Sequence, residues 1–268
     1  MTINTPKPNV SNPWLPTVSI LMVIIIFLSG LFAPKGWNWA LVMLFMIVFI
    51  ALIGKMITNR YSGIFIDERY MMSLSRFQLV IWTLIVLSAF LTIALERVYA
   101  GVPNPLAIAL PTQLWELLGI STTSLVGSPL IQSVKVQKKP NDAAVEKAVP
   151  LFVSAGKANA TKDYISKNVE AFGISAFNEK PADANFSNLF TGDEIGNIGQ
   201  IDMGKVQMFF FTLVIAFSYM VLLVNLIMTA QPAALNSFPQ LDNSVVALLG
   251  ISAAGFLTNK AVDHTKTQ

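Results

Sequence analysis

Four long stretches of this chain carry no charged side chain, and they restrict the folds that it can adopt. They cover residues 15–32, 36–54, 77–95 and 206–241. Crossing hydrocarbon takes about 20 apolar residues in an α-helix, whose backbone groups then bond to one another. Only 12% of the residues are charged and 54% are hydrophobic, whereas soluble domains contain about 25% charged residues. We therefore expect an all-α, polytopic membrane helix bundle.

Hydrophobicity predicts six transmembrane helices, of which the fourth and sixth are weaker because they are rich in Gly, Ser, Thr and Ala. With six crossings and both termini in the cytoplasm, 16 of the 18 basic residues lie on the cytoplasmic side, and only Lys35 and Arg97 lie outside. This distribution follows the positive-inside rule. The first span lacks a small-residue cleavage site, which favours a retained hairpin over a signal peptide. The expected spans are residues 15–33, 37–57, 76–97, 112–133, 205–229 and 244–261.

The largest polar segment lies between the fourth and fifth spans, at residues 137–203. Helices are expected near 141–154, bent or ended before Pro150, and near 161–172. The segment is short for an independent core, so we expect it to pack on the bundle or a partner, or to be partly mobile. The predicted parts are a cytoplasmic N-tail (1–14), a transmembrane hairpin (15–57), a cytoplasmic linker (58–75), a first helix pair (76–136), the cytoplasmic insertion (137–203), a second helix pair (204–262) and a C-tail (263–268).

The two helix pairs share a pattern that indicates an internal duplication. The first opens Ser-Arg-Phe-Gln at 75–78 and reaches Leu-Leu-Gly-Ile-Ser at 117–121. The second opens Gly-Lys-Val-Gln at 204–207 and reaches the same pentapeptide at 248–252. Both copies run from inside to outside and return. We therefore predict a parallel two-fold repeat about an axis along the membrane normal.

Small and polar residues of the two pairs are the candidate site residues. Small residues recur every four positions on one face of each return helix, which allows close helix packing in lipid. Packing is the favoured interpretation, and a pore or substrate seam is the alternative. The basic residues that open the two copies, Arg76 and Lys205, suit lipid head groups. The candidate packing or pathway residues are Gln78, Thr83, Gly119, Thr123, Gly127, Gln207, Thr212, Asn225, Gly250, Ala254 and Thr258.

Several chemistries are disfavoured by the sequence. The chain has no cysteine and a single histidine, His264, which excludes thiolate sites and a multi-histidine metal site within one chain. Residues 199–205 fit GxxxxGK, but Val206 replaces the Ser or Thr that binds magnesium. Residues 67–69 and 193–194 are interpreted as charges in contact with solvent. We predict no catalytic residue, no metal, no cofactor and no nucleic-acid partner.

One set of motifs carries a resemblance. Met-Ser-Leu-Ser-Arg-Phe-Gln at 72–78, the two Leu-Leu-Gly-Ile-Ser pentapeptides and Gly-Phe-Leu-Thr-Asn-Lys-Ala at 255–261 resemble a group of uncharacterised bacterial integral membrane proteins with a duplicated SLSRxQ…LLGIS helix pair. The likeness covers roughly residues 60–135 and 185–262. It implies a multi-pass protein of the bacterial inner (cytoplasmic) membrane and carries over no catalytic residue.

The leading hypothesis is a non-enzymatic membrane scaffold or anchor. Such a protein would contact membrane lipids and assemble as a homo-oligomer or with partner proteins. The alternative is a channel or transporter subunit with a pathway between the two repeats or at an oligomer axis. No carboxylate is predicted near the bilayer midplane, which disfavours an ion-coupled pump. An enzyme is the third choice.

Overall fold

The computed structural model describes residues 13–268, and these residues form eight α-helices and no strands. Six of the helices are long and apolar enough to cross a membrane, which confirms the predicted fold class and spans. The predicted N-tail, with Lys7, lies almost wholly outside the described residues. The six helices are α1 (Trp14–Phe32), α2 (Trp37–Thr58), α3 (Leu74–Tyr99), α4 (Thr112–Val136), α7 (Met203–Thr229) and α8 (Asn243–Ala261).

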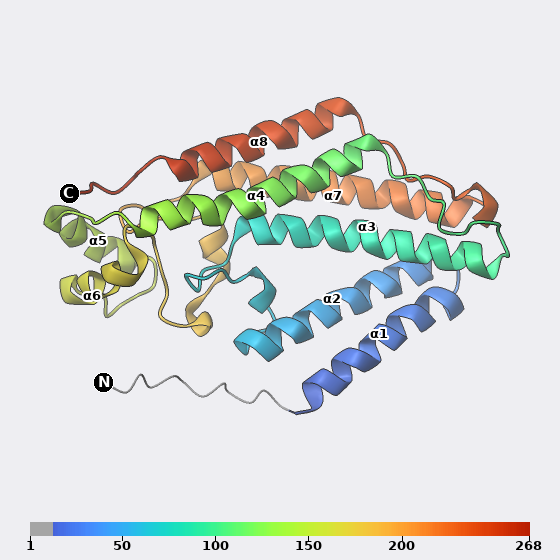
Figure 1. Cartoon of the computed structure of the whole chain (residues 1–268), viewed down its shortest axis with the longest axis horizontal. Coiled ribbons are helices and arrows are strands. Elements are labelled where there is room, and N and C mark those ends of the chain that lie inside the picture. Colours follow the sequence, from blue (N-terminus) through green and yellow to red (C-terminus); the bar gives the residue numbers. More distant parts are fainter. Residues whose placement is uncertain (1–12) are drawn as a thin grey trace.

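The six long helices alternate in direction. Figure 1 shows α1, α3 and α7 running away from the end that holds α5 (Asp142–Ser154) and α6 (Lys162–Phe172), and α2, α4 and α8 running back to it. Helix α3 is central, since it contacts α1, α2, α4 and α7. Helix α8 packs on both α4 and α7. The hairpin of α1 and α2 therefore adds to one side of a group formed by α3, α4, α7 and α8.

Aromatic side chains fill the centre of this group. Trp82 of α3 and Tyr219 of α7 are fully buried, with ring centroids 6.3 Å apart. The Tyr219 hydroxyl donates to the carbonyl of Pro239 (3.0 Å), and Trp39 Nε1 donates to Ser88 Oγ (2.9 Å). These bonds satisfy polar atoms that would otherwise be costly in an apolar interior. Trp82 thus belongs to the bundle core.

The outer face of α7 shows the opposite pattern. Four large apolar residues are more than half exposed and recur at i, i+4, i+7 and i+11, the spacing of one helix face. Such a face suits hydrocarbon and not water. The residues are Phe210, Val214, Phe217 and Val221.

Two loops are fastened together at the end of the bundle opposite α5 and α6. Arg97 lies there with only 4% of its surface exposed. Its Nε and Nη2 donate to the carbonyls of Pro105 (3.0 Å) and Asn104 (3.3 Å). Its Nη1 donates to the carbonyl of Leu235 (3.0 Å), in the loop between α7 and α8. Arg97, one of the two basic residues predicted to lie outside, therefore links the loop after α3 to the loop between α7 and α8.

The insertion between α4 and α7 has a small apolar core of its own. Helices α5 and α6 contribute Phe152 and Ile165, and the ring of Phe177 packs against that of Phe152 at a tilt of 52°. Helix α5 continues through Pro150 to Ser154, so it does not end before the proline. Met71, from the linker before α3, completes this core. The insertion is thus packed against the bundle through the linker.

The helices α3 and α7 begin in the same way. The side chain of Ser73 caps α3 by accepting from the backbone N–H of Arg76, and Asp202 caps α7 by accepting from that of Lys205. Side-chain oxygens at this position satisfy one of the free N–H groups of the first turn. Ser73 and Asp202 are 129 positions apart, and so are Arg76 and Lys205. In both helices the capping residue therefore lies three positions before the basic residue.

Candidate functional site: a buried ionic network

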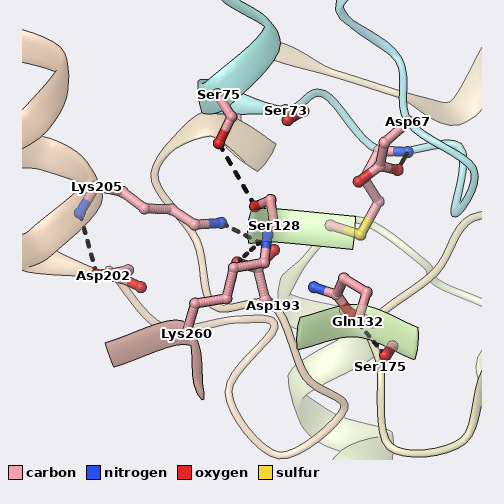
Figure 2. A network of polar contacts seen from close by, with 12 residues as sticks. Asp67, Ser73, Ser75, Ser128, Gln132, Ser175, Asp193, Asp202, Lys205 and Lys260 are labelled. Carbon is pink, nitrogen blue, oxygen red and sulfur yellow. Dashed lines mark hydrogen bonds and ion pairs between the residues drawn. The ribbon is translucent and has the colours of Figure 1, made fainter. Parts of the chain in front are cut away.

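A buried carboxylate stands where the insertion meets the bundle. Asp193, in the loop before α7, is 7% exposed. Its oxygens lie 3.0 Å from Arg69 Nη2, 3.1 Å from Lys205 Nζ and 3.2 Å from Lys260 Nζ. Figure 2 shows both lysines directed at it. The three cations come from the linker, the first turn of α7 and the last turn of α8, so one side chain joins four segments.

A tight turn in the linker holds Arg69 in place. Asp67 Oδ2 accepts from Arg69 Nη2 (2.7 Å) and Nε (3.1 Å), while its Oδ1 accepts from the backbone N–H groups of Arg69 and Met71. Tyr70, inside the turn, has a positive φ of 57°. Arg69 Nη1 also donates to the carbonyl of Asp193 (3.1 Å). The fork of the guanidinium therefore bridges linker and insertion.

The two lysines reach Asp193 from helix ends. The ammonium of Lys205 also donates to the carbonyls of Thr191 (2.6 Å) and Asn188 (3.4 Å). Lys260 lies in the last turn of α8, where a cation is favoured by the helix dipole, and its ammonium sits 5.5 Å from the ring centre of Phe256. Both side chains are at least nine-tenths buried.

A second buried pair lies beside the first. Lys135, near the end of α4, pairs with Glu194, and both side chains are almost fully buried. Lys135 Nζ donates to the carbonyl of Val262 (2.9 Å), and Glu194 Oε2 accepts from the backbone N–H of His264 (2.9 Å). This pair fastens α4 and the C-terminal tail to the insertion.

The charges of the network are mutually stabilised. Burial raises the pKa of Asp193, but the charges of Lys205, Lys260 and Arg69 outweigh it and hold that pKa well below its usual value. Burial also raises the pKa of Asp67, but Arg69, Lys260 and the backbone N–H of Met71 together bring that pKa below its usual value. Burial lowers the pKa of Arg69, yet Asp67 and Asp193 bring it above its ordinary value. Both carboxylates are therefore ionised at neutral pH.

Sequence interpretation missed this site. The acidic residues at 67 and 193–194 were expected to be solvated, but Asp193 and Glu194 are buried, and Asp67 is bonded to Arg69. The difference has a physical cause: apart from the Asp67–Arg69 and Asp193–Lys205 pairs, the partners of these carboxylates are more than 50 positions away along the chain. Glycines beside the acids, Gly192 and Gly196, were the available signal. A Cβ on either would meet neighbouring atoms within 3 Å, so these loop segments are closely packed.

The polar residues predicted to lie within the helices differ in burial and in hydrogen bonding. Gln78 is 1% exposed, and neither atom of its amide has a partner among the described residues. Its counterpart Gln207 is exposed. Thr212 is buried and donates to the carbonyl of Met208 (2.8 Å), Thr83 is half-buried, and Asn225 is exposed. The structure does not gather this set into one site.

Four of the six predicted small residues line a groove between α4 and α8, with a volume of about 730 Å³. A Cβ built on Gly127 would lie 3.5 Å from the side chain of Leu257. A Cβ built on Gly250 would lie 3.6 Å from the side chain of Ile120. The two helices therefore pack through large side chains set against glycines. The groove is lined by Gly119, Thr123, Gly250 and Ala254 of the predicted set, whereas Thr258 is exposed outside it.

The side chains of Arg76 and Lys205, the two residues predicted to contact lipid head groups, point to different surroundings. Arg76 is half-buried, and its Nη1 donates to the carbonyl of Ile66 (2.6 Å). It lines a cavity of about 370 Å³ between the start of α3 and the last turns of α4. Lys205 is 3% exposed and faces the ionic network. Only Arg76 is therefore placed where it can meet a ligand from outside the bundle.

Comparison with protein-family models, with curated proteins and with solved structures finds no match to the chain. The class of the protein rests on its own architecture. Six apolar helices and the absence of strands from residues 13–268 define a multi-pass helical membrane protein. Within the same residues, no three His, Cys, Asp or Glu side chains are grouped to hold a metal ion.

We expect Asp193→Asn to destabilise the protein by about 3–5 kcal/mol, because three buried cations lose their shared counter-charge. Thermal unfolding in detergent, followed by near-UV circular dichroism, would measure the change. Asp263→Asn is the matched control, since Asp263 pairs with Lys138 where both side chains are about one-third exposed. Such a pair contributes about 0–1 kcal/mol. Equal unfolding temperatures for the two variants would contradict a stabilising role for Asp193.

Proposed function

We propose that the protein is a non-enzymatic membrane scaffold that presents its insertion to partner proteins. The observation that carries the proposal is the Asp193 network, which joins the insertion to the linker, α7 and α8. A polar segment tied to a bundle by buried ion pairs has a defined orientation on it. A defined orientation is what an assembly platform needs, because it lowers the entropy lost when a partner binds.

The surface of the insertion supports the same proposal. The faces of α5 and α6 that point away from the shared core carry charges of both signs. Mixed charges of this kind favour selective, electrostatically steered contacts with a soluble partner. The exposed charged residues are Asp142, Glu146 and Lys147 on α5, and Lys162, Asp163, Lys167 and Glu170 on α6.

The placement in a bacterial inner membrane, with the insertion in the cytoplasm, is part of the proposal. It is supported by the excess of basic residues at the end that carries α5 and α6 and by the motif resemblance. We also propose that the α3–α4 and α7–α8 pairs arose by duplication. The support is their shared direction and the equal spacing of the Ser73 and Asp202 caps.

The scaffold proposal predicts that affinity capture of the tagged protein in mild detergent returns a partner in stoichiometric amount. Reversing charges on the insertion with K147E and K167E should reduce the captured partner at least several-fold, because both lysines are exposed on the proposed surface. Lys139→Glu, an exposed site before α5, is the control and should leave capture unchanged. Recovery of the protein alone, from native membranes and at native abundance, would reject the scaffold.

The proposed orientation can be tested by accessibility labelling, since a chain without cysteine needs no background removal. Lys147→Cys lies on α5, and Ala234→Cys lies in the loop between α7 and α8, and both positions are exposed. A membrane-impermeant maleimide should reach position 234 in intact cells and position 147 only after the membrane is opened. Reaction of both positions from the same side would contradict the six-span orientation.

One observation favours the alternative of a channel or transporter subunit. Several buried polar atoms in the group formed by α3, α4, α7 and α8 have no hydrogen-bond partner among residues 13–268. Buried polar atoms without a partner are uncommon in protein cores. A transported solute or water could satisfy them. They include the amide of Gln78, the indole N–H of Trp82 and the hydroxyls of Ser121, Ser124 and Ser252.

Under this alternative, purified protein in liposomes conducts ions or moves a solute, and Gln78→Leu lowers the flux at least several-fold because it removes a polar contact from the path. Gln207→Leu is the matched control, since Gln207 is exposed. Flux can be followed with ion-sensitive dyes and by solute-driven vesicle swelling. Absence of flux under every gradient would reject a pathway within the single chain.

A further inference from the structure

The cavity at the cytoplasmic ends of α3 and α4 has a polar side and an apolar side. Its volume is about 370 Å³, which is within the range of small-molecule sites. The polar lining comes from the linker, the first turn of α3, the last turns of α4 and the last turn of α8. The polar residues that line it include Arg69, Arg76, Gln132 and Lys260, together with Asp67 and the exposed Glu68.

The charges beside this cavity do not balance. In the buried network, the cations of Arg69, Lys205 and Lys260 face only two carboxylates, those of Asp67 and Asp193. On the cavity wall, Arg76 adds a positive charge and the exposed Glu68 a negative one, so four cations face three carboxylates. Unbalanced charge in a site of low dielectric is costly unless a counter-ion lies close by. The arrangement therefore favours an anion in the cavity.

Hydrogen-bond donors on the cavity wall are free to hold such an anion. Gln132 Oε1 accepts from Ser175 Oγ (2.8 Å), but its Nε2 is buried without a partner among the described residues. Lys260 Nζ lies 3.2 Å from Asp193 Oδ2, an oxygen that accepts no aligned hydrogen bond within the described part of the chain. Arg76 uses Nη1 to bond the Ile66 carbonyl, which leaves further N–H groups of its guanidinium.

The opposite wall is hydrocarbon. Leu79 and Val80 of α3 and Leu125 of α4 line it, and all three are in the transmembrane helices. The wall continues along α4 to Val126 and Leu130, which are more than half exposed and therefore face lipid. A ligand that fits both walls has an anionic head and an apolar chain.

We propose that this cavity binds the phosphate group of an anionic phospholipid. Arg76, Lys260 and Gln132 hold the phosphate, and an acyl chain lies along Leu79, Val80 and Leu125. Basic pockets between membrane helices at the cytoplasmic surface favour such head groups. A free phosphate ion shares the chemistry of the head group, but the apolar wall gives it no contact. The inference holds whether or not the protein acts as a scaffold.

The test is native mass spectrometry of the purified full-length chain in detergent, with phosphatidylglycerol, phosphatidylcholine or inorganic phosphate added separately. We expect retained phosphatidylglycerol at one site and little phosphatidylcholine. Arg76→Gln should weaken retention about fivefold, the effect of one basic residue at a membrane surface. Val80→Trp should also weaken it, because the larger side chain fills the cavity without changing a charge.

Lys139→Gln is the matched control, since it removes an exposed charge elsewhere on the cytoplasmic side and should leave retention unchanged. Gel filtration and far-UV circular dichroism would establish that each variant is folded. Equal retention of the two lipids would overturn the proposal. So would unchanged retention in folded Arg76→Gln and Val80→Trp, and displacement of phosphatidylglycerol by millimolar inorganic phosphate would assign the site to a free ion.

Discussion

The position of the insertion depends on one buried carboxylate. A charged side chain is removed from water at a cost of several kcal/mol, and the cost is recovered only when partners surround it with good geometry. Asp193 has such partners because Arg69, Lys205 and Lys260 converge on it from three separate segments. If any one segment moved away, two or more charges would lose their contacts. The linker, α7 and α8 are thereby held in one arrangement, and the insertion is held with them.

The ends and the middle of the bundle are stabilised by different physical means. In the middle, where water is absent, apolar packing and satisfied groups such as Tyr219 dominate. At the two ends, buried cations bond to carbonyls or carboxylates. Arg97 does so between the outer loops, and Lys135 does so beside the C-terminal tail. Basic residues that the positive-inside rule treats only as topology markers therefore also act as cross-links.

The sequence was sufficient to predict the spans because a helix in lipid must satisfy its own backbone and expose apolar side chains, and both requirements are local. Helices α5 and α6 were also found, since Asn141 and Thr161 are ordinary N-caps. The ionic network was missed, because charged residues such as Arg69 and Asp193 are 124 positions apart. The flanking glycines Gly192 and Gly196 indicate close packing, but they do not identify Arg69 and Lys260, which are far from Asp193 along the chain, as its partners. The sequence also could not predict that the small residues of α4 and α8 line an exposed groove. Their exposure depends on how the large side chains of the two helices pack between them.

The two similar helix starts show how one local pattern acquires two roles. Ser73 and Asp202 form the same cap, so the backbones that carry Arg76 and Lys205 begin alike. Their surroundings differ because the insertion leads directly into α7, and its loop places Asp193 beside Lys205. Before α3 the short linker directs its own Arg69 to that same carboxylate, so Arg76 is left at the edge of a cavity. The inserted segment therefore accounts for the asymmetry: one basic residue is used to fasten the fold, and the other is left available to a ligand.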